Sequence, residues 1–182
     1  QPRSRGLGDV YKRQAVITER DKMIRSFPPI INSETEILIV GTMPSVKSLE
    51  AQQYYAHPRN AFWKIIAALY HQGAEFADFQ EKKACLLANR LGLWDSLQLC
   101  LREGSLDSAI TDEQPNDFNT LLAEHPAVRR LLFNGQPAFK FFKKYHAPLL
   151  LRTEYYILPS TSPANASYSL DDKIRIWAPY LK

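Results

Sequence analysis

The chain has 182 residues, of which 45% are hydrophobic and 23% charged, and its formal net charge is +4. This length suits one domain with a well-buried core, and the composition is ordinary for a soluble globular protein. No apolar run approaches the roughly 20 residues that cross a bilayer, and no apolar segment near the N-terminus resembles a secretory signal, so we expect no membrane contact.

Cysteine and histidine usage argues against a metal or redox centre. Cys85 and Cys100 are the two cysteines of the chain, too few for an iron–sulfur cluster or an all-cysteine zinc site. A disulfide between them is the alternative, but the low count suits a reducing cytoplasm better. The four histidines are widely scattered, and there is no G-x-G-x-x-G, Walker, G-x-S-x-G or H-E-x-x-H motif. We therefore predict neither a metal site nor a cofactor.

The first fourteen residues, QPRSRGLGDVYKRQ, differ from the rest of the chain. They show no hydrophobic periodicity and resemble a vector-derived translation, so we predict a non-native or disordered head at 1–14 and one domain at 15–182. A genuine basic arm for nucleic acid is the alternative. Four of the 23 basic residues and one of the 19 acidic residues lie in this head, so the net charge without it is +1. Overall charge is then weak evidence for DNA binding.

The predicted elements alternate between helices and strands along the chain. In order, we expect a helix at 15–26, a strand at 36–40, helices at 60–71 and 76–89, a strand at 91–94, a helix at 117–123, a strand at 128–133, a helix at 137–145, a strand at 155–158 and a terminal helix from 169 that Pro179 limits. We predict polar connections at 104–108 and 112–117, and a pairing of Asp171 with Arg175. The alternation predicts an α/β fold with a parallel sheet covered on both faces.

Three polar stretches follow predicted strands: GTMPS at 41–45, FNGQ at 133–136 and LPSTSPAN at 158–165. In a parallel sheet these ends meet at one edge, where ligands bind. Glycine, proline and serine suit tight turns whose N–H and hydroxyl groups can hold an anion such as phosphate. Tyr54 and Tyr55 lie in the loop after the first stretch, and aromatic faces can stack on a planar base.

At this point the sequence resembles the uracil-DNA glycosylase superfamily. YAHPRNAFWK at 55–64, after GTMPS, is similar to the first motif region, in particular that of the hypoxanthine-DNA (deoxyinosine) glycosylase branch, which is related to mismatch-specific uracil-DNA glycosylases. Supporting segments are GLWDSL at 92–97, REGSLDSAI at 102–110, PNDF at 115–118, LLFNG at 131–135 and LPSTSPANA at 158–166. The resemblance covers about residues 27–181.

The resemblance implies a three-layer α/β/α fold with a short central parallel sheet. It implies hydrolysis of the N-glycosidic bond of a deaminated base, hypoxanthine or also uracil, flipped out of DNA. We expect a monofunctional enzyme, because the motifs position no lysine for Schiff-base chemistry, and we expect a monomer. We assign one set of residues to the base pocket and one to the DNA-binding surface. The base-binding set is Gly41, Thr42, Met43, Pro44, Tyr55 and Asn134, and the DNA-binding set is Ser45, Arg59, Ser160, Thr161, Ser162, Pro163 and Asn165. Asn134 and Arg59 are assigned from their chemistry, since an amide can meet a base edge and a charge beside Asn60 can steer DNA, and the others match the motifs of the family.

One position departs from the mismatch-specific pattern. In the mismatch-specific branch, the residue just before the proline of the first motif is an asparagine, which positions the attacking water. This chain has Met43 at that place. A thioether cannot orient water. The resemblance to the deoxyinosine branch places the catalytic asparagine at Asn60 instead.

Structural interpretations remain open beside these assignments. Asn60 begins a predicted helix and is also expected there as an N-cap. One of Tyr54 and Tyr55 is expected to be exposed and the other to join the core. His57 is expected to order its loop, with a role as acid or base as the alternative. Asn134 has a turn role as its alternative to a base-edge contact, and the motif serines can cap turns instead of contacting phosphate. The tryptophans Trp63, Trp94 and Trp177 are expected in the core.

Two other functions fit the same sequence. The departure at Met43 leaves room for a non-catalytic binder of DNA or nucleotides on the same fold. A small-molecule nucleosidase or hydrolase is the second alternative, and activity on free deoxyinosine rather than DNA would identify it. The choice between hypoxanthine and uracil depends on pocket shape, which pattern analysis does not supply.

Overall fold

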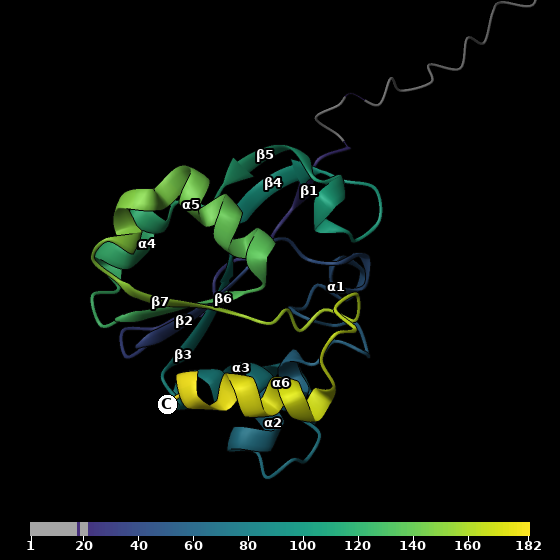
Figure 1. The fold of residues 1–182 in the computed structure, drawn as a ribbon, viewed down its shortest axis with the longest axis vertical. Coiled ribbons are helices and arrows are strands. Elements are labelled where there is room, and N and C mark those ends of the chain that lie inside the picture. The colour runs from purple at the N-terminus through teal and green to yellow at the C-terminus, as the bar shows by residue number, and fades with distance from the viewer. Residues whose placement is uncertain (1–17, 19–21) are drawn as a thin grey trace, which may run out of the picture.

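The computed structural model describes residue 18 and residues 22–182 (Figure 1). Four parallel strands form the central sheet, in the order β3-β2-β6-β7. Their bounds are Ile37–Gly41 for β2, Leu91–Asp95 for β3, Arg130–Asn134 for β6 and Glu154–Leu158 for β7. Each lies within two residues of a predicted strand, so the predicted parallel sheet is confirmed.

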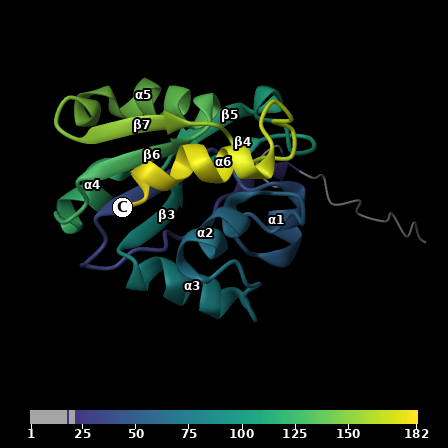
Figure 2. The same ribbon diagram turned by 60° about the horizontal axis from the view of Figure 1, so that its bottom comes forward.

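Helices cover both faces of this sheet, which confirms the three-layer α/β/α architecture. Figure 1 shows α4 and α5 on one face and α2, α3 and α6 on the other, and the turned view of Figure 2 separates the layers. The helix bounds are Val46–Ala51 for α1, Phe62–Tyr70 for α2, Phe79–Ala88 for α3, Phe118–Glu124 for α4, Gln136–Leu150 for α5 and Leu170–Trp177 for α6.

The side chains of β2 explain why the sheet needs two covering layers. Ile37 and Ile39 belong to the core cluster under α2, α3 and α6, whereas Leu38 and Val40 belong to the cluster under α4 and α5. Alternate residues of a strand point to opposite faces, and all four are almost completely buried. A strand that is apolar on both faces is stable only between two packed layers.

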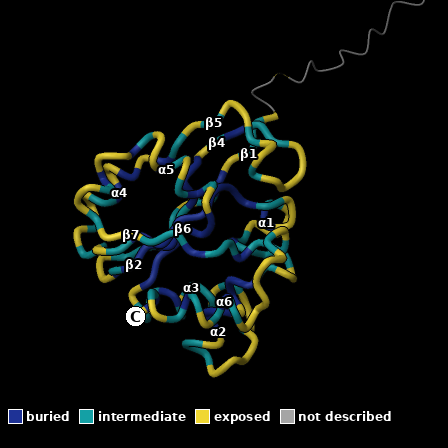
Figure 3. Tube along the Cα trace, viewed as in Figure 1, coloured by how far each residue is buried: buried dark blue, intermediate teal, exposed yellow. Residues whose placement is uncertain are grey.

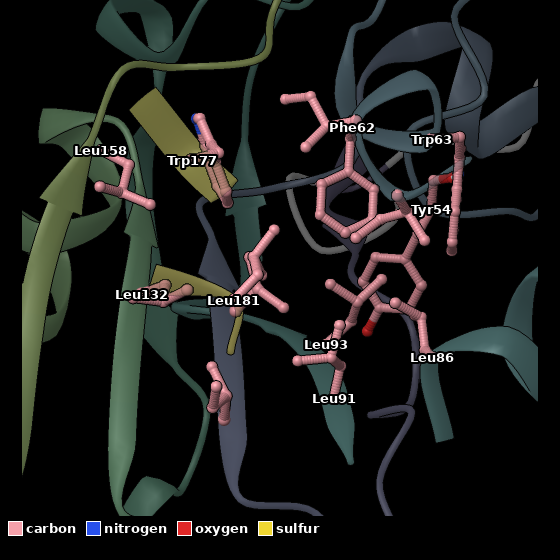
Figure 4. Close-up of a cluster of buried hydrophobic side chains, with 14 of the residues drawn as sticks. Tyr54, Phe62, Trp63, Leu86, Leu91, Leu93, Leu132, Leu158, Trp177 and Leu181 are labelled. Atoms are coloured by element: carbon pink, nitrogen blue, oxygen red, sulfur yellow. The ribbon is translucent and has the colours of Figure 1, made fainter. Parts of the chain in front are cut away.

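The larger core cluster is rich in aromatic rings (Figure 4). Phe62 and Trp177 are fully buried, and their rings meet edge to face with centroids 6.4 Å apart. Trp63 also packs into this core, as predicted, while Trp94 is half-buried beside Phe118. Figure 3 shows the burial concentrated in the central strands, with exposed residues in the loops and on the outer helix faces. The core therefore anchors the strand ends from which the site loops emerge.

A second sheet was not predicted. Its order is β1-β4-β5, formed by Ile24–Arg25, Leu97–Leu101 and Thr111–Pro115, and all its pairings are antiparallel. The predicted polar connection at 112–117 is thus mostly strand β5. A 3-10 turn, Asp107–Ala109 (η2), lies in the connection between β4 and β5, and a second one, Ala178–Tyr180 (η3), follows α6.

Some local predictions fall outside the described residues or are wrong. The head at 1–14 and half of the predicted helix at 15–26 lie outside, but Ile24–Arg25 is a strand instead of a helix. Helix α1 is unpredicted: Ser45 caps it, and its six residues are too few to show a periodicity. Arg175 pairs with Asp172 instead of Asp171 because Ser169 and Asp172 form a capping box that holds this carboxylate in place.

In the part of the chain that the structure describes, no helix is both long and apolar enough to cross a membrane.

Candidate active site

A cavity of about 540 Å³ opens where the strands of the central sheet end. Residues from the ends of β2, β3 and β6 and from the loop after β7 line it. Gly41 pairs with Asp95 at one strand end, and Asn134 pairs with Leu158 at another. The expectation that the three polar stretches meet at one edge is therefore confirmed. The lining includes Gly41, Thr42, Met43, Pro44, Ser45, Tyr55, His57, Asn60, Asp95, Asp107, Asn134, Ser160, Thr161, Ser162, Pro163 and Asn165.

The loop after β2 leaves space for two side chains from other elements. A Cβ on Gly41 would lie 2.5 Å from Oδ1 of Asp95 and 2.8 Å from the hydroxyl of Tyr55, so any larger residue would displace both. Met43 is buried and packs against Leu97 and Cys100 while also lining the cavity. Its thioether is thus part of a wall, which fits the expectation that it does not orient water.

The two tyrosines differ from the expected pattern of one buried and one exposed ring. Tyr54 is buried, and its hydroxyl donates to the carbonyl of Pro28 at 2.8 Å. Tyr55 is half-buried, with its ring centroid 4.4 Å from that of Phe62, and it lines the cavity. Its φ of 53° is in the left-handed region, which is uncommon for a non-glycine residue. Burial, helped by the charge of Asp95, raises the pKa of Tyr55 far above its ordinary value, so the phenol stays neutral.

Asn60 lies at the cavity just before α2. Its Oδ1 accepts a hydrogen bond from the N–H of Phe62 at 2.9 Å, which caps the first turn of the helix and fixes the orientation of the amide. The expected capping role is therefore present, although Ala61 occupies the cap position itself. An amide oxygen has a second lone pair, and no described residue uses the Nδ2 group in a hydrogen bond. Capping and water positioning are thus compatible in one side chain.

His57 orders the same loop, as expected. Its Nδ1 accepts from the N–H of Arg59 at 3.1 Å, and its carbonyl accepts from the N–H of Asn60 at 2.9 Å. A neutral ring with Nδ1 as acceptor carries its proton on Nε2. The imidazole therefore holds the backbone that presents Asn60.

Asn134 and Thr161 are joined by two hydrogen bonds. The amide of Asn134 donates to Oγ1 of Thr161 and accepts from its N–H, both at 2.9 Å. The carbonyl of Thr161 accepts from Ala61 N–H at 3.0 Å, so this pair links the ends of β6 and β7 to the start of α2. Thr161 is fully buried and also lines the cavity. Its hydrogen bonds give it a role in shaping the loop, and its predicted contact with DNA stays a prediction.

The loop after β7 is held in shape by its own side chains. The hydroxyls of Ser160 and Ser162 each accept from a backbone N–H two residues later, so the expected turn-capping roles are present. Asn165 donates from its amide to the carbonyl of Ser160. From α6, the ammonium group of Lys173 donates to the carbonyls of Ser162 and Asn165. Both serine hydroxyl protons remain available to an acceptor outside the loop.

A smaller hollow of about 230 Å³ adjoins the cavity and shares Pro163 and Asn165 with it. Arg59 and Lys64 line it, and both are exposed. Lys173 lines it as well, so the hollow combines Pro163 and Asn165 of the loop after β7 with three cationic side chains. Such a surface suits the phosphates of a nucleic-acid backbone.

Two acidic residues of the cavity were absent from the predicted site. Asp95 ends β3, is 3% exposed, and has a pKa raised to about 7, first by burial and then by the charge of Asp107, with Arg102 opposing. Burial also raises the pKa of Asp107, against hydrogen bonding with Thr42 and the charge of Arg102. A carboxylate directly after a buried strand was the signal in the sequence, because the ends of the other strands were already assigned to the site. Among residues 18 and 22–182, no group of three or more potential metal ligands comes together.

Comparison with known proteins shows which family this chain belongs to. Residues 28–180 match the family model of the uracil DNA glycosylase superfamily. A hypoxanthine DNA glycosylase of Methanosarcina acetivorans is 40% identical over 147 residues, which cover 80% of this chain and 90% of that protein. One from Methanosarcina barkeri is 35% identical over 160 residues, covering 87% of this chain and 98% of that protein. A solution NMR structure of a Methanosarcina acetivorans protein described as a candidate uracil DNA glycosylase superposes with a TM-score of 0.73 at 37% identity, over 87% of this chain and 97% of that one.

Proposed function

The chain belongs to the uracil DNA glycosylase superfamily, and from this premise we propose that it removes hypoxanthine from DNA. It is a DNA repair glycosylase that acts on deaminated bases, as the two related hypoxanthine DNA glycosylases indicate. Among the deaminated bases, we assign hypoxanthine as the main substrate and uracil as a second one. Water cleaves the N-glycosidic bond, and no Schiff base forms with the protein.

The observation that carries this proposal is the cavity at the strand ends. Its volume of about 540 Å³ lies within the range of ordinary ligand sites, roughly 300–1,000 Å³. Tyr54, Tyr55 and several polar groups line it, as recognition of a planar base with polar edges requires. A base inside a duplex cannot reach such a cavity, so the nucleotide has to be flipped out of the stack.

In the proposed complex, the base stacks on Tyr55, and the segment from Gly41 to Pro44 forms the pocket around it. Base stacking on an aromatic side chain is worth about 1–3 kcal/mol. Asn134 bonds twice to Thr161 and also hydrogen-bonds with the side chain of Tyr55, so we assign it to holding the pocket wall and the stacking ring, and any base contact requires it to exchange one of these bonds.

Asn60 is the proposed catalytic residue. The sugar becomes positively charged as the base leaves, and water has to reach C1′ from the opposite side. The amide of Asn60, fixed by Phe62 N–H, can accept a hydrogen bond from this water through its second lone pair. Preorganised polar groups of this kind contribute about 3–4 kcal/mol to the transition state.

The DNA backbone is proposed to lie across the smaller hollow. Arg59 supplies charge there, and Ser45, Ser160, Ser162, Pro163 and Asn165 form the adjoining rim of the cavity. Lys64 lines the same hollow and joins this surface. Because the net charge without the head is only +1, this local patch has to supply most of the attraction for phosphate.

The experiment is a panel of labelled oligonucleotides that carry hypoxanthine, uracil or xanthine, single- and double-stranded, treated with alkali after incubation. Alkali-labile sites at hypoxanthine support the proposal. A band shift without cleavage would identify a binding protein, and activity confined to free deoxyinosine would identify a nucleosidase. Covalent trapping with borohydride would contradict a purely hydrolytic mechanism.

Asn60→Ala tests the catalytic assignment. It should lower the single-turnover rate on the hypoxanthine oligonucleotide by roughly 100- to 1,000-fold. Asn119→Ala is the matched control, because Asn119 is an exposed asparagine of α4 that does not line the cavity. An unchanged rate for Asn60→Ala would show that another group positions the water.

We further propose a monomer in the cytoplasm. Both cysteines are free thiols, as a reducing compartment allows, and residues of a single chain line the whole cavity. Sedimentation at micromolar concentration tests the monomer, and fractionation of cells tests the compartment.

A further inference from the structure

Asp95 is a buried carboxyl group without an adequate set of partners. It ends β3 and lines the cavity, yet only 3% of the residue is exposed. No hydrogen bond from any described residue reaches its Oδ2, which is shielded from solvent. Its backbone carbonyl is held by the amide of Asn116 at 2.7 Å, so the residue cannot easily move to find a partner. Unsatisfied buried polar atoms are rare and destabilising, so this one calls for a functional explanation.

The surroundings of Asp95 keep a proton on it. The titratable and charged groups that face it are Tyr54 and Tyr55 from the loop before α2, Asp107 from η2, and Arg102 after β4. Burial is the largest cause of its raised pKa of about 7, the negative charge of Asp107 adds to it, and Arg102 opposes it. Arg102 donates from Nε and Nη2 to the carbonyls of Gly104 and Pro44, while its Nη1 is buried without a partner among the described residues. At neutral pH a large share of the Asp95 carboxyl groups is therefore protonated.

We propose that Asp95 is a second catalytic residue, an acid that protonates the purine ring as the base leaves. This inference rests on the proposed function and goes beyond the assignment of Asn60. It is carried by the position of the carboxyl in the cavity floor beside Gly41 and Tyr55, and by its unpartnered Oδ2. The missing Cβ of Gly41 gives the carboxyl the space that it occupies there.

The proton and electron balance closes within one turnover. The bond between C1′ and N9 breaks, and its electron pair goes to the purine. The proton of Asp95 goes to N7 of the imidazole ring, so that hypoxanthine leaves as a neutral molecule. Water adds to the cationic C1′, and the proton that this water releases returns to the Asp95 carboxylate, directly or through solvent. General acid catalysis of this kind contributes typically about 100- to 10,000-fold to a rate.

The proposal distinguishes purines from pyrimidines. Hypoxanthine offers N7 as an acceptor, whereas uracil has no equivalent ring nitrogen and leaves as an anion stabilised by its carbonyl groups. A protonated carboxyl therefore assists the purine specifically. Asp95 would then be a determinant of base choice as well as of rate.

The experiment compares wild type with Asp95→Asn on two substrates, an oligonucleotide with deoxyinosine and one with 7-deaza-deoxyinosine. The replacement keeps the shape of the side chain but cannot transfer a proton. On deoxyinosine we expect the single-turnover rate at saturating enzyme to fall by about 100-fold or more, with the affinity for DNA changed much less. On 7-deaza-deoxyinosine the rates of the variant and the wild type should differ by less than about tenfold. The analogue has no N7 to protonate, so removing the Asp95 carboxyl as well costs little more, and the effects of the two changes do not multiply.

A pH profile supplies a second readout. For wild type, the rate on deoxyinosine should fall as pH rises above about 7, where the carboxyl loses its proton, and Asp95→Asn should lack this limb. Asp171→Asn is the matched control, since Asp171 is an exposed carboxylate of α6 away from the cavity. The substrate analogue on wild-type protein tests the idea even if the variant folds poorly.

The outcomes separate this inference from the proposed function. Wild-type protein that leaves all deaminated bases intact would overturn the proposed function and the inference with it. Wild-type cleavage of deoxyinosine with an equal rate and pH profile for Asp95→Asn would overturn the inference alone. Equal losses from the substitution on deoxyinosine and on its 7-deaza analogue would also overturn it, because the carboxyl would then act elsewhere than at N7.

Discussion

Replacing Asp95 by asparagine should change the pH dependence of stability in a defined direction. Folding raises the pKa of this carboxyl from 3.8 to about 7. Between these values the unfolded chain has lost the proton that the folded protein still holds. The unfolding free energy of the wild type therefore falls as pH rises from about 4 to about 7. Below this window the ionisation of Asp95 does not affect stability, and above it the cost of burying the ionised carboxylate is fully present.

The magnitude follows from the width of the window. At about 1.4 kcal/mol per pH unit, a shift from 3.8 to about 7 corresponds to about 4 kcal/mol of unfolding free energy. Asp95→Asn removes this contribution at every pH. The asparagine amide of the variant does not titrate, so its own effect on the unfolding free energy is the same at every pH. This effect cancels when the stabilities at two pH values are compared. Relative to wild type, the variant should gain about 4 kcal/mol between about pH 4 and about pH 8.5.

Urea unfolding of both proteins at several pH values across this range measures the effect. Asp171→Asn, which removes one exposed carboxylate, controls for the change in net charge. Parallel stability curves for wild type and Asp95→Asn would refute the reasoning, because the carboxyl would then titrate alike in the folded and unfolded chain. The expected gain in stability together with the expected loss of activity is the trade-off typical of strained active sites.

Three further substitutions test the site and its support. Gly41→Ala should abolish cleavage and destabilise the fold by about 1–3 kcal/mol, because the new Cβ would lie 2.5 Å from Asp95 Oδ1; single-turnover kinetics and thermal unfolding measure both effects. Tyr55→Ala should weaken binding of a DNA whose flipped base cannot be cleaved by roughly 5- to 150-fold, and Tyr55→Phe by much less, since a phenyl ring still stacks; equal affinities for the two variants would contradict the stacking role. Ser169→Ala should lower the unfolding free energy by about 1 kcal/mol, because it removes the capping box with Asp172, and should leave the cleavage rate unchanged.

The parallel sheet could be predicted because its strands are apolar on both faces. The run from Ile37 to Val40 has no polar residue, and such runs exist only between two packed layers. Helix α2 could also be predicted, because its apolar side chains recur every three or four residues. The edge at which the loops meet then followed from the parallel direction of the strands.

The antiparallel sheet was not predictable in the same way. Strand β5, with the sequence TDEQP, has no apolar alternation and is mostly exposed, so its structure comes from pairing with β4 instead of from its own side chains. Helix α1 spans six residues, too few for a periodicity, and depends on the cap at Ser45. Local sequence carries little signal where a distant partner supplies the hydrogen bonds.

The site shows the same division. By itself, the sequence determined which loops form the site and which residue types they carry, because motifs and strand ends are local features. It also indicated Asn60 and Tyr55, whose roles remain proposals. The tertiary structure alone decided that Thr161 is buried against Asn134 and that Oδ2 of Asp95 lies at the cavity without a hydrogen-bond partner among the described residues. Burial and the distance to charges such as Asp107 and Arg102 set the protonation of a carboxyl, and these quantities exist only after distant segments have packed together.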